Sequence, residues 1–159
     1  MPFFISKKVC LTVFIAVFSF SAVFTASADF DTTMDSILSE EMLSYGSASY
    51  VLLTGTGVLG DDATIQEAAG KMAQQFPDSA LEWNEPVNLG HFSYMIMNAY
   101  GIGGGIMYRI FPGPRYALRE LRFKKIIQER AYSTMDISGE RALRIVGRVL
   151  DREEAGDEE

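Results

Sequence analysis

The sequence contains one cysteine, one histidine and one tryptophan among 159 residues. Because Cys10 has no second cysteine to pair with, the chain must be stabilised by packing rather than by disulfides. His91 is the only histidine, and Cys10 lies in an N-terminal segment that is expected to be cleaved off. A monomer without that segment can assemble neither a zinc site of the usual nitrogen and sulfur type nor a Cys–His nucleophile pair. The sequence therefore predicts a protein that is not an enzyme and that has no metal or other cofactor.

Long apolar runs are absent except at the N-terminus. Lys7 and Lys8 precede an almost unbroken apolar run at residues 9–24, and Ala26-Ser27-Ala28 offers small residues at both recognition positions of a signal peptidase site. This pattern predicts a secretory signal over residues 1–28 and a mature chain exported to the periplasm or cell envelope. The alternative is an uncleaved anchor, because about 18 apolar residues can span a bilayer, and only then would a membrane be a partner.

Positive charge is scarce in the first half of the chain and concentrated in the second. Lys71 is the only base among residues 29–107, against eleven acids, whereas residues 108–150 contain ten bases and four acids. Such asymmetry is typical of a surface that binds an anionic polymer, a membrane or nucleic acid, although the two halves can also neutralise one another. Because export is predicted, nucleic acid is the partner that we least expect, and none is predicted.

The remaining chain is long enough for one domain with its own core. We expect an N-terminal lead and short helix over 29–47, with a flexible part at 29–35 and a helix at 36–43. A helical domain should follow over 48–150, and then a disordered acidic tail over 151–159. The apolar segment at 48–56 fits either a buried helix or a strand.

Helix starts carry the clearest local signals. Thr64 and Glu67 have the spacing of a capping box, and Asn88 and Ser138 are further cap residues. Each cap follows an apolar residue, and the Val87-Asn88 pair recurs as Ile137-Ser138 fifty positions later, with Ala63-Thr64 as a third copy. Pro114 can begin a helix that runs from about Arg115 through Arg130.

The segment at residues 51–69, Val-Leu-Leu-Thr-Gly-Thr-Gly-Val-Leu-Gly followed by the Thr64 capping box, resembles a degenerate S-layer homology module. In that family a short helix ends in a Gly-apolar-x-Gly turn, and a loop leads to a Thr-Arg-x-Glu-type cap and a second helix. Residues 116–150 resemble a second unit, and residues 86–102 match the second half of one. The resemblance implies a compact all-α array of helix-loop-helix units whose grooves bind cell-wall polysaccharide. Gln66 departs from the family at the position that usually holds arginine, and Asn88-Leu89-Gly90-His91 departs further.

Candidate binding residues surround the glycine-rich loop at 101–105 and the Pro112-Gly113-Pro114 turn. Arginines at i, i+4 and i+7 would present three guanidinium groups on one helix face, which suits carboxylates and phosphates. The alternative is a solvated face, or pairing with acids such as Glu120 and Glu129. Trp83 is either a lid over the core or a platform for a sugar ring. The candidate residues are Trp83, Tyr108, Arg109, Arg115, Tyr116, Arg119 and Arg122.

These features together predict a non-enzymatic envelope protein that binds cell-wall glycan, either peptidoglycan or an associated anionic polymer. The competing hypothesis is a protein-interaction or scaffold module within a periplasmic assembly. Such a module would use the same surface, or an apolar face around Met95, Met97 and Met107.

Overall fold

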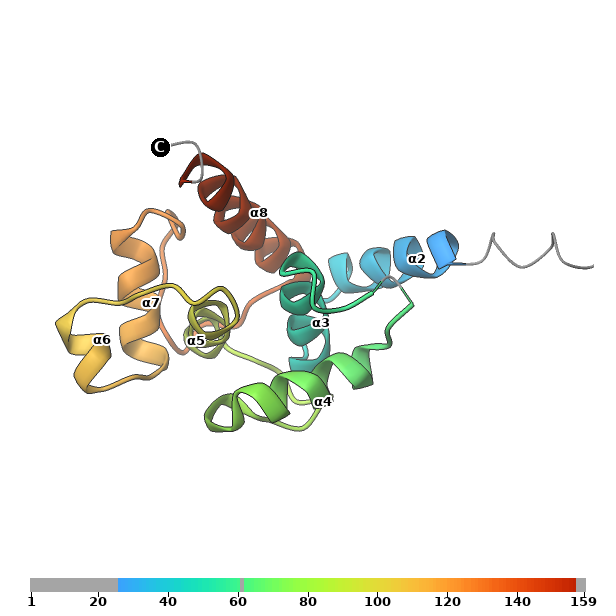
Figure 1. Ribbon diagram of the computed structural model, residues 1–159, viewed down its shortest axis with the longest axis horizontal. Coiled ribbons are helices and arrows are strands. Elements are labelled where there is room, and N and C mark those ends of the chain that lie inside the picture. Colours follow the sequence, from blue (N-terminus) through green and yellow to red (C-terminus); the bar gives the residue numbers. More distant parts are fainter. Residues whose placement is uncertain (1–25, 61, 157–159) are drawn as a thin grey trace, which may run out of the picture.

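The computed structural model describes residues 26–60 and 62–156, and within these ranges it is helical with no β-strand (Figure 1). The predicted all-α class is therefore confirmed. Most of the predicted secretory signal lies outside the described residues, as does Cys10. The described elements are α2 (Ala26–Leu38), α3 (Tyr45–Gly55), α4 (Ile65–Gln75), the 3-10 turn η1 (Pro77–Ser79), α5 (Leu89–Ala99), α6 (Ile106–Ile110), α7 (Pro114–Phe123) and α8 (Gly139–Gly156). None of these helices combines the length and the hydropathy that crossing a membrane requires.

Helix α2 occupies the segment for which a flexible lead was predicted at 29–35. Phe30, Met34 and Ile37 recur at helical spacing and pack against the core, where Ile37 is fully buried. The Phe30 ring also contacts the Tyr50 ring of α3, with centroids 6.4 Å apart. The prediction of a separate helix over 36–43 is wrong as well. Residues 36–38 are the last residues of α2, which ends at Leu38, and the chain then turns.

The apolar stretch at 48–56, which fitted either a helix or a strand, lies in α3. Every residue from 45 to 53 is buried, so α3 is the most enclosed helix among those described. Ser44 caps it by accepting a hydrogen bond from the Ser47 N–H at 3.2 Å. The Glu40 carboxylate completes the cap, because it accepts from the Ser44 N–H at 3.0 Å and from the Ser47 hydroxyl at 2.6 Å.

The predicted caps of three other helices are confirmed. At the start of α4, the Thr64 hydroxyl accepts from the Glu67 N–H at 3.2 Å and the Glu67 carboxylate accepts from the Thr64 N–H at 2.9 Å. Asn88 and Ser138 accept from amides in the first turns of α5 and α8, at 2.9 and 3.4 Å. These side chains satisfy donors that a helix N-terminus otherwise leaves unpaired.

Backbone hydrogen bonds join the starts of α3, α5 and α8 into a closed ring, and these three helices are called the ring helices. The first amide of each helix donates to a carbonyl in the segment that leads to another of the three. These bonds run from Tyr45 to Glu85 (2.8 Å), from Leu89 to Met135 (2.7 Å) and from Gly139 to Glu40 (2.9 Å). Helix α3 is therefore tied to the approach to α5, α5 to the approach to α8, and α8 to the approach to α3.

The residue before each of these three caps is buried beside the ring. Leu43, Val87 and Ile137 are at most 3% exposed, and Leu43 is hydrogen-bonded through its backbone to both of the others. Leu43-Ser44 is thus a further copy of the repeat and belongs to the ring, whereas the predicted copy Ala63-Thr64 caps the outer helix α4. Each ring helix carries one outer helix, because α4 packs on α3, α7 on α5 and α2 on α8.

Helix α7 is shorter than predicted, ending at Phe123 instead of continuing through Arg130. Lys125 adopts the left-handed backbone conformation, with φ at 60°, and this turns the chain. The turn carries Ile126 and Ile127 into the core, where each is 3% exposed. Burial of these two side chains offsets the cost of a left-handed lysine.

Helix α8 is longer than predicted and continues to Gly156. Residues 151–156, expected to belong to a disordered tail, are therefore helical. The Arg148 and Arg152 guanidinium groups donate to the Ile126 and Lys124 carbonyls, at 3.2 and 2.7 Å. These contacts fasten the C-terminal half of α8 to the turn that follows α7.

Candidate functional site

Helix α7 has one buried face and one cationic face. Its buried side chains are Ala117, Leu118 and Leu121, which lie on the side of the helix that packs on α5. The exposed face carries the three guanidinium groups whose spacing predicted a common face. These residues, Arg115, Arg119 and Arg122, are called the arginine row below.

The arginine row borders an open cleft of about 590 Å³ between α7 and the segment at 131–134. Tyr116 and Tyr132 supply aromatic rings to this cleft, and Ser133 and Thr134 supply hydroxyl groups. The last two arginines of the row also border a second depression of about 440 Å³, together with Phe123 and Lys125. The row is thus a cationic ridge between two hollows.

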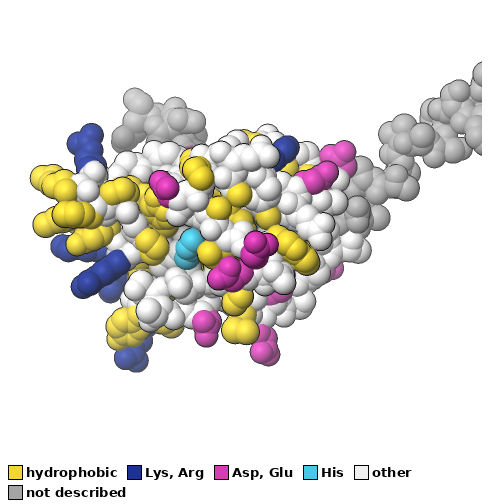
Figure 2. All heavy atoms as spheres, turned by 90° about the horizontal axis from the view of Figure 1, so that it is seen from below, with side chains coloured by type: hydrophobic (Ala, Val, Ile, Leu, Met, Phe, Trp, Pro, Cys, Tyr) yellow, Lys and Arg dark blue, Asp and Glu magenta, His cyan; other side chains and the backbone are white. Residues whose placement is uncertain are grey.

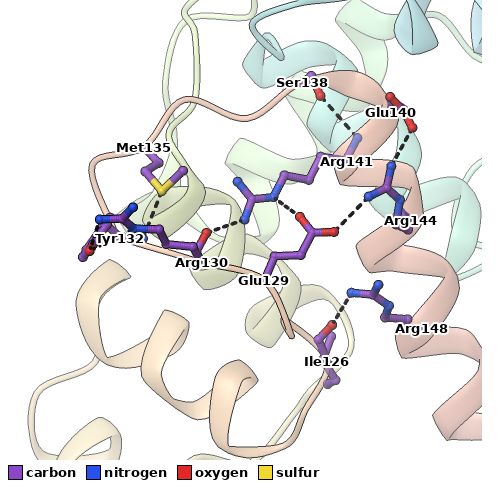
Figure 3. A network of polar contacts seen from close by, with 10 residues as sticks. All are labelled: Ile126, Glu129, Arg130, Tyr132, Met135, Ser138, Glu140, Arg141, Arg144 and Arg148. Atoms are coloured by element: carbon purple, nitrogen blue, oxygen red, sulfur yellow. Dashed lines mark hydrogen bonds and ion pairs between the residues drawn. The ribbon is translucent and has the colours of Figure 1, made fainter.

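The Tyr132 ring is held in place at the edge of the cleft by Arg130. The guanidinium carbon of Arg130 lies 5.4 Å from the ring centroid, and its Nε and Nη2 atoms each lie 3.2 Å from the tyrosine hydroxyl, to which they donate (Figure 3). The ring remains 55% exposed. A fixed and exposed aromatic ring beside cations is suited to stacking on the apolar face of a sugar.

No residue of the arginine row forms an ion pair or a side-chain hydrogen bond with the described part of the chain. Glu129, one of the predicted partners, is bound instead by Arg141 at 3.5 Å and by Arg144 at 2.9 Å (Figure 3). Arg144 also pairs with Glu140. Among the described residues, the ion pairs join α8 to Glu129 or lie within α8, and none involves the arginine row. Unpaired cations beside a cleft raise the local concentration of anions.

Tyr108 and Arg109 lie on α6, and neither lines the cleft. Tyr108 is half-buried and its ring meets that of Tyr94 edge-on, with centroids 6.3 Å apart. Burial, together with the neighbouring Tyr94, raises the pKa of Tyr108 to about 12. Tyr108 therefore attaches α6 to α5 and does not present a free ring to a ligand, whereas Arg109 is exposed to solvent.

Trp83 also lies apart from the cleft. Its carbonyl accepts from the Gly46 N–H at 2.7 Å, which places it beside the start of α3, and its side chain is 46% exposed. Of the predicted residues, the structure brings together Arg115, Tyr116, Arg119 and Arg122.

Sequence reasoning missed the segment at 131–134, which forms the second wall of the cleft. The fifty-residue offset contained a usable signal, because it aligns Ser133 with Trp83. In the structure the two residues play the same part: the backbone carbonyl of each accepts from a glycine N–H in the first turn of α3 or α5. Ser133 accepts from Gly90 at 3.0 Å, as Trp83 does from Gly46.

The remaining candidates for chemistry have structural roles. His91 is partly buried, its Nε2 atom lies 2.9 Å from the Ser79 carbonyl and its ring meets Tyr45 edge-on. No group of three or more metal-binding side chains occurs among the described residues. Met95 and Met97, proposed for the competing protein-interaction face, are buried in α5, so of that set only Met107 is available at the surface.

Comparison of the chain with models of known protein families, with curated proteins and with solved structures finds no match.

Proposed function

We propose that this protein is a non-enzymatic component of the cell envelope that binds an anionic cell-wall polymer in the cleft between α7 and residues 131–134. The observation that carries the proposal is the uncompensated arginine row beside two aromatic rings. The ligand class is a glycan that bears carboxylate or phosphate groups, as peptidoglycan and its associated polymers do.

The chemistry of the cleft supports a repeating anionic ligand. Guanidinium groups bind carboxylate and phosphate oxygens in a bidentate manner, which a lysine cannot reproduce. Positions i and i+7 of a helix are separated by about 10 Å along its axis, so the row can contact charges on successive units of a polymer. Tyr116 and Tyr132 add faces on which a sugar ring can stack.

The S-layer homology resemblance points to the same ligand class. In that family, grooves between helical units bind wall polysaccharide. Here the cleft forms between α7 and the segment that leads to α8, within the stretch that resembles the second unit. Gln66 lies in α4, which does not line the cleft, whereas the departure at residues 88–91 lies at the start of α5, where Gly90 donates to the carbonyl of Ser133 in the cleft wall.

Export follows from the predicted secretory signal and places the protein where wall polymers are found. Cleavage after Ala28 would remove only the first three residues of α2. The side chains through which α2 packs, Phe30, Met34 and Ile37, would all remain in the mature chain. The proposed processing is therefore compatible with the packed domain.

A pull-down on purified peptidoglycan, with its attached anionic polymers retained, tests the proposal. The wild-type protein should sediment with the polymer, and the Arg115→Ala, Arg119→Ala double variant should lose at least about tenfold in affinity, because each charge-assisted contact contributes about 1.5–3 kcal/mol. The Arg115→Lys, Arg119→Lys variant keeps the charge and should bind with intermediate affinity.

The matched control is the Lys71→Ala, Arg109→Ala variant, which removes two exposed cations outside the cleft. It should bind as the wild type does. A wild-type protein that remains in solution, or a control variant that loses as much affinity as the double variant, would show that the cleft is not the binding site.

A further inference from the structure

Helix α6 forms an apolar extremity of the molecule, at the left of Figure 1. None of its residues is buried, although four of the five are large and apolar or aromatic. Phe123, at the end of the neighbouring α7, is the most exposed large hydrophobic residue among those described, at 83%. The other exposed side chains of this apolar end are Ile106 (75%), Phe111 (61%), Ile110 (58%) and Met107 (53%).

This apolar end is a fixed feature of the fold. Tyr108 holds α6 against Tyr94 of α5, and a side chain on Gly104 would collide with the Tyr108 ring. The helix is therefore attached on one side and presents its apolar side chains outward.

Cations surround the apolar end. Residues 106–125 contain six bases and one acid, Glu120. None of the six forms an ion pair with the described residues. Figure 2 shows hydrophobic and Lys or Arg side chains crowded at the same end of the molecule, whereas Asp and Glu side chains lie mainly over the middle and the opposite end. The six bases are Arg109, Arg115, Arg119, Arg122, Lys124 and Lys125.

We propose that this end rests on the surface of an anionic lipid bilayer, with the apolar side chains of α6 and Phe123 among the acyl chains and the surrounding cations at the level of the lipid phosphates. Apolar side chains flanked by bases are the features by which a protein surface binds such a bilayer without spanning it. This contact is independent of the N-terminal segment, through which the sequence alone allowed membrane binding.

A second copy of the chain fits the apolar end less well. A stable protein interface takes about 20–30 residues on each partner, whereas the exposed side chains of the apolar end come from five residues. A bilayer needs no matching surface, because each apolar side chain that enters it contributes separately.

A tryptophan in place of Phe111, the exposed residue that ends α6, tests the proposal in the full chain. Trp83 is the only tryptophan, so the Trp83→Phe, Phe111→Trp variant reports on α6 alone, whatever the N-terminal segment does. Vesicles of phosphatidylcholine with phosphatidylglycerol should shift its emission to shorter wavelength, and brominated acyl chains should quench it. Adding Ile106→Ser and Ile110→Ser should lower the apparent affinity for these vesicles about 100-fold, which is about tenfold for each side chain.

The matched control carries its tryptophan at Val58, an exposed apolar residue between α3 and α4 (Trp83→Phe, Val58→Trp). The emission of this control should not change when anionic vesicles are added. The emission of the Phe111→Trp variant should shift far less with vesicles of phosphatidylcholine alone. Three results would overturn the proposal: no response of α6 to anionic vesicles, equal responses to both vesicle types, or a shift without vesicles that grows with protein concentration, which would indicate a second copy. No wall polymer is present, so failure here leaves the polymer proposal standing.

Discussion

Acidic side chains at the helix starts explain part of the uneven charge of this chain. Glu40 accepts two hydrogen bonds at the start of α3, and Glu67 accepts from the Thr64 backbone and hydroxyl at the start of α4. A carboxylate at this position also interacts favourably with the helix dipole. These acids of the first half therefore stabilise local structure and are not available to neutralise the arginine row.

The Glu67 carboxylate should make stability depend on pH. Hydrogen bonds from the Thr64 backbone and side chain lower its pKa below the ordinary value of 4.5. Since the unfolded chain then binds this proton more readily, the stabilisation is complete above pH 4.5 and is lost as the pH falls through the folded-state pKa. The difference in unfolding free energy between wild type and Glu67→Gln should therefore shrink in acid, as urea denaturation at several pH values can measure. A difference that stays constant with pH would contradict this assignment.

At the scale of the element, glycine allows two ring helices to begin against a neighbouring segment. A Cβ atom on Gly90 would lie 2.8 Å from both the Cβ and the carbonyl oxygen of Ser133. One on Gly46 would lie 2.9 Å from the Trp83 carbonyl. Both glycines donate their own N–H to the carbonyl they approach, so each close contact is part of how the helix start is satisfied.

Two glycine-to-alanine substitutions should have opposite effects. Gly90→Ala in α5 should destabilise the protein by about 1–3 kcal/mol, because Ser133 would have to move. Gly70→Ala in α4, where nothing lies within 4 Å of the added carbon, should stabilise it by about 0.5–1 kcal/mol through reduced backbone entropy of the unfolded chain. Urea denaturation compares them directly, and equal effects of the two substitutions would show that the close contact at α5 is unimportant.

Local signals predicted where several helices begin, because a cap depends on residues within one turn. Thr64, Asn88 and Ser138 are predicted for that reason. The Ser44 cap has the same local spacing, because its hydroxyl accepts from the Ser47 N–H, but a helix over 36–43 was expected in its place. Signals for where helices end were weaker. The turn after α7 contains neither glycine nor proline and depends on burial of Ile126 and Ile127, which only the tertiary structure reveals.

The candidate site was predicted only in part, for a related reason. Helical periodicity was enough to place the arginine row on one face of α7. It could not show that Glu129 would pair with α8 or that residues 131–134 would form the opposite wall. Both depend on the turn at Lys125, which brings the chain back beside α7 and toward α8.

At the scale of the whole molecule, the ring of helix starts positions the site. The Leu89–Met135 and Gly90–Ser133 hydrogen bonds hold the segment before α8 against α5. Because α7 packs on the same helix, the two walls of the cleft are fixed relative to each other through α5. Without these hydrogen bonds, the exposed face of α7 would be an ordinary solvated face. With residues 131–134 held opposite it, the same face is one wall of a cleft.

The proposed binding of an anionic wall polymer can be followed at the guanidinium groups of the arginine row themselves. The most direct measurement is NMR of the arginine side-chain Nε–H groups during titration with soluble peptidoglycan fragments. The signals of Arg115, Arg119 and Arg122 should shift together with one dissociation constant, while those of the ion-paired Arg141 and Arg144 should stay in place. Row signals that do not move, or that move no more than those of Arg141 and Arg144, would contradict it.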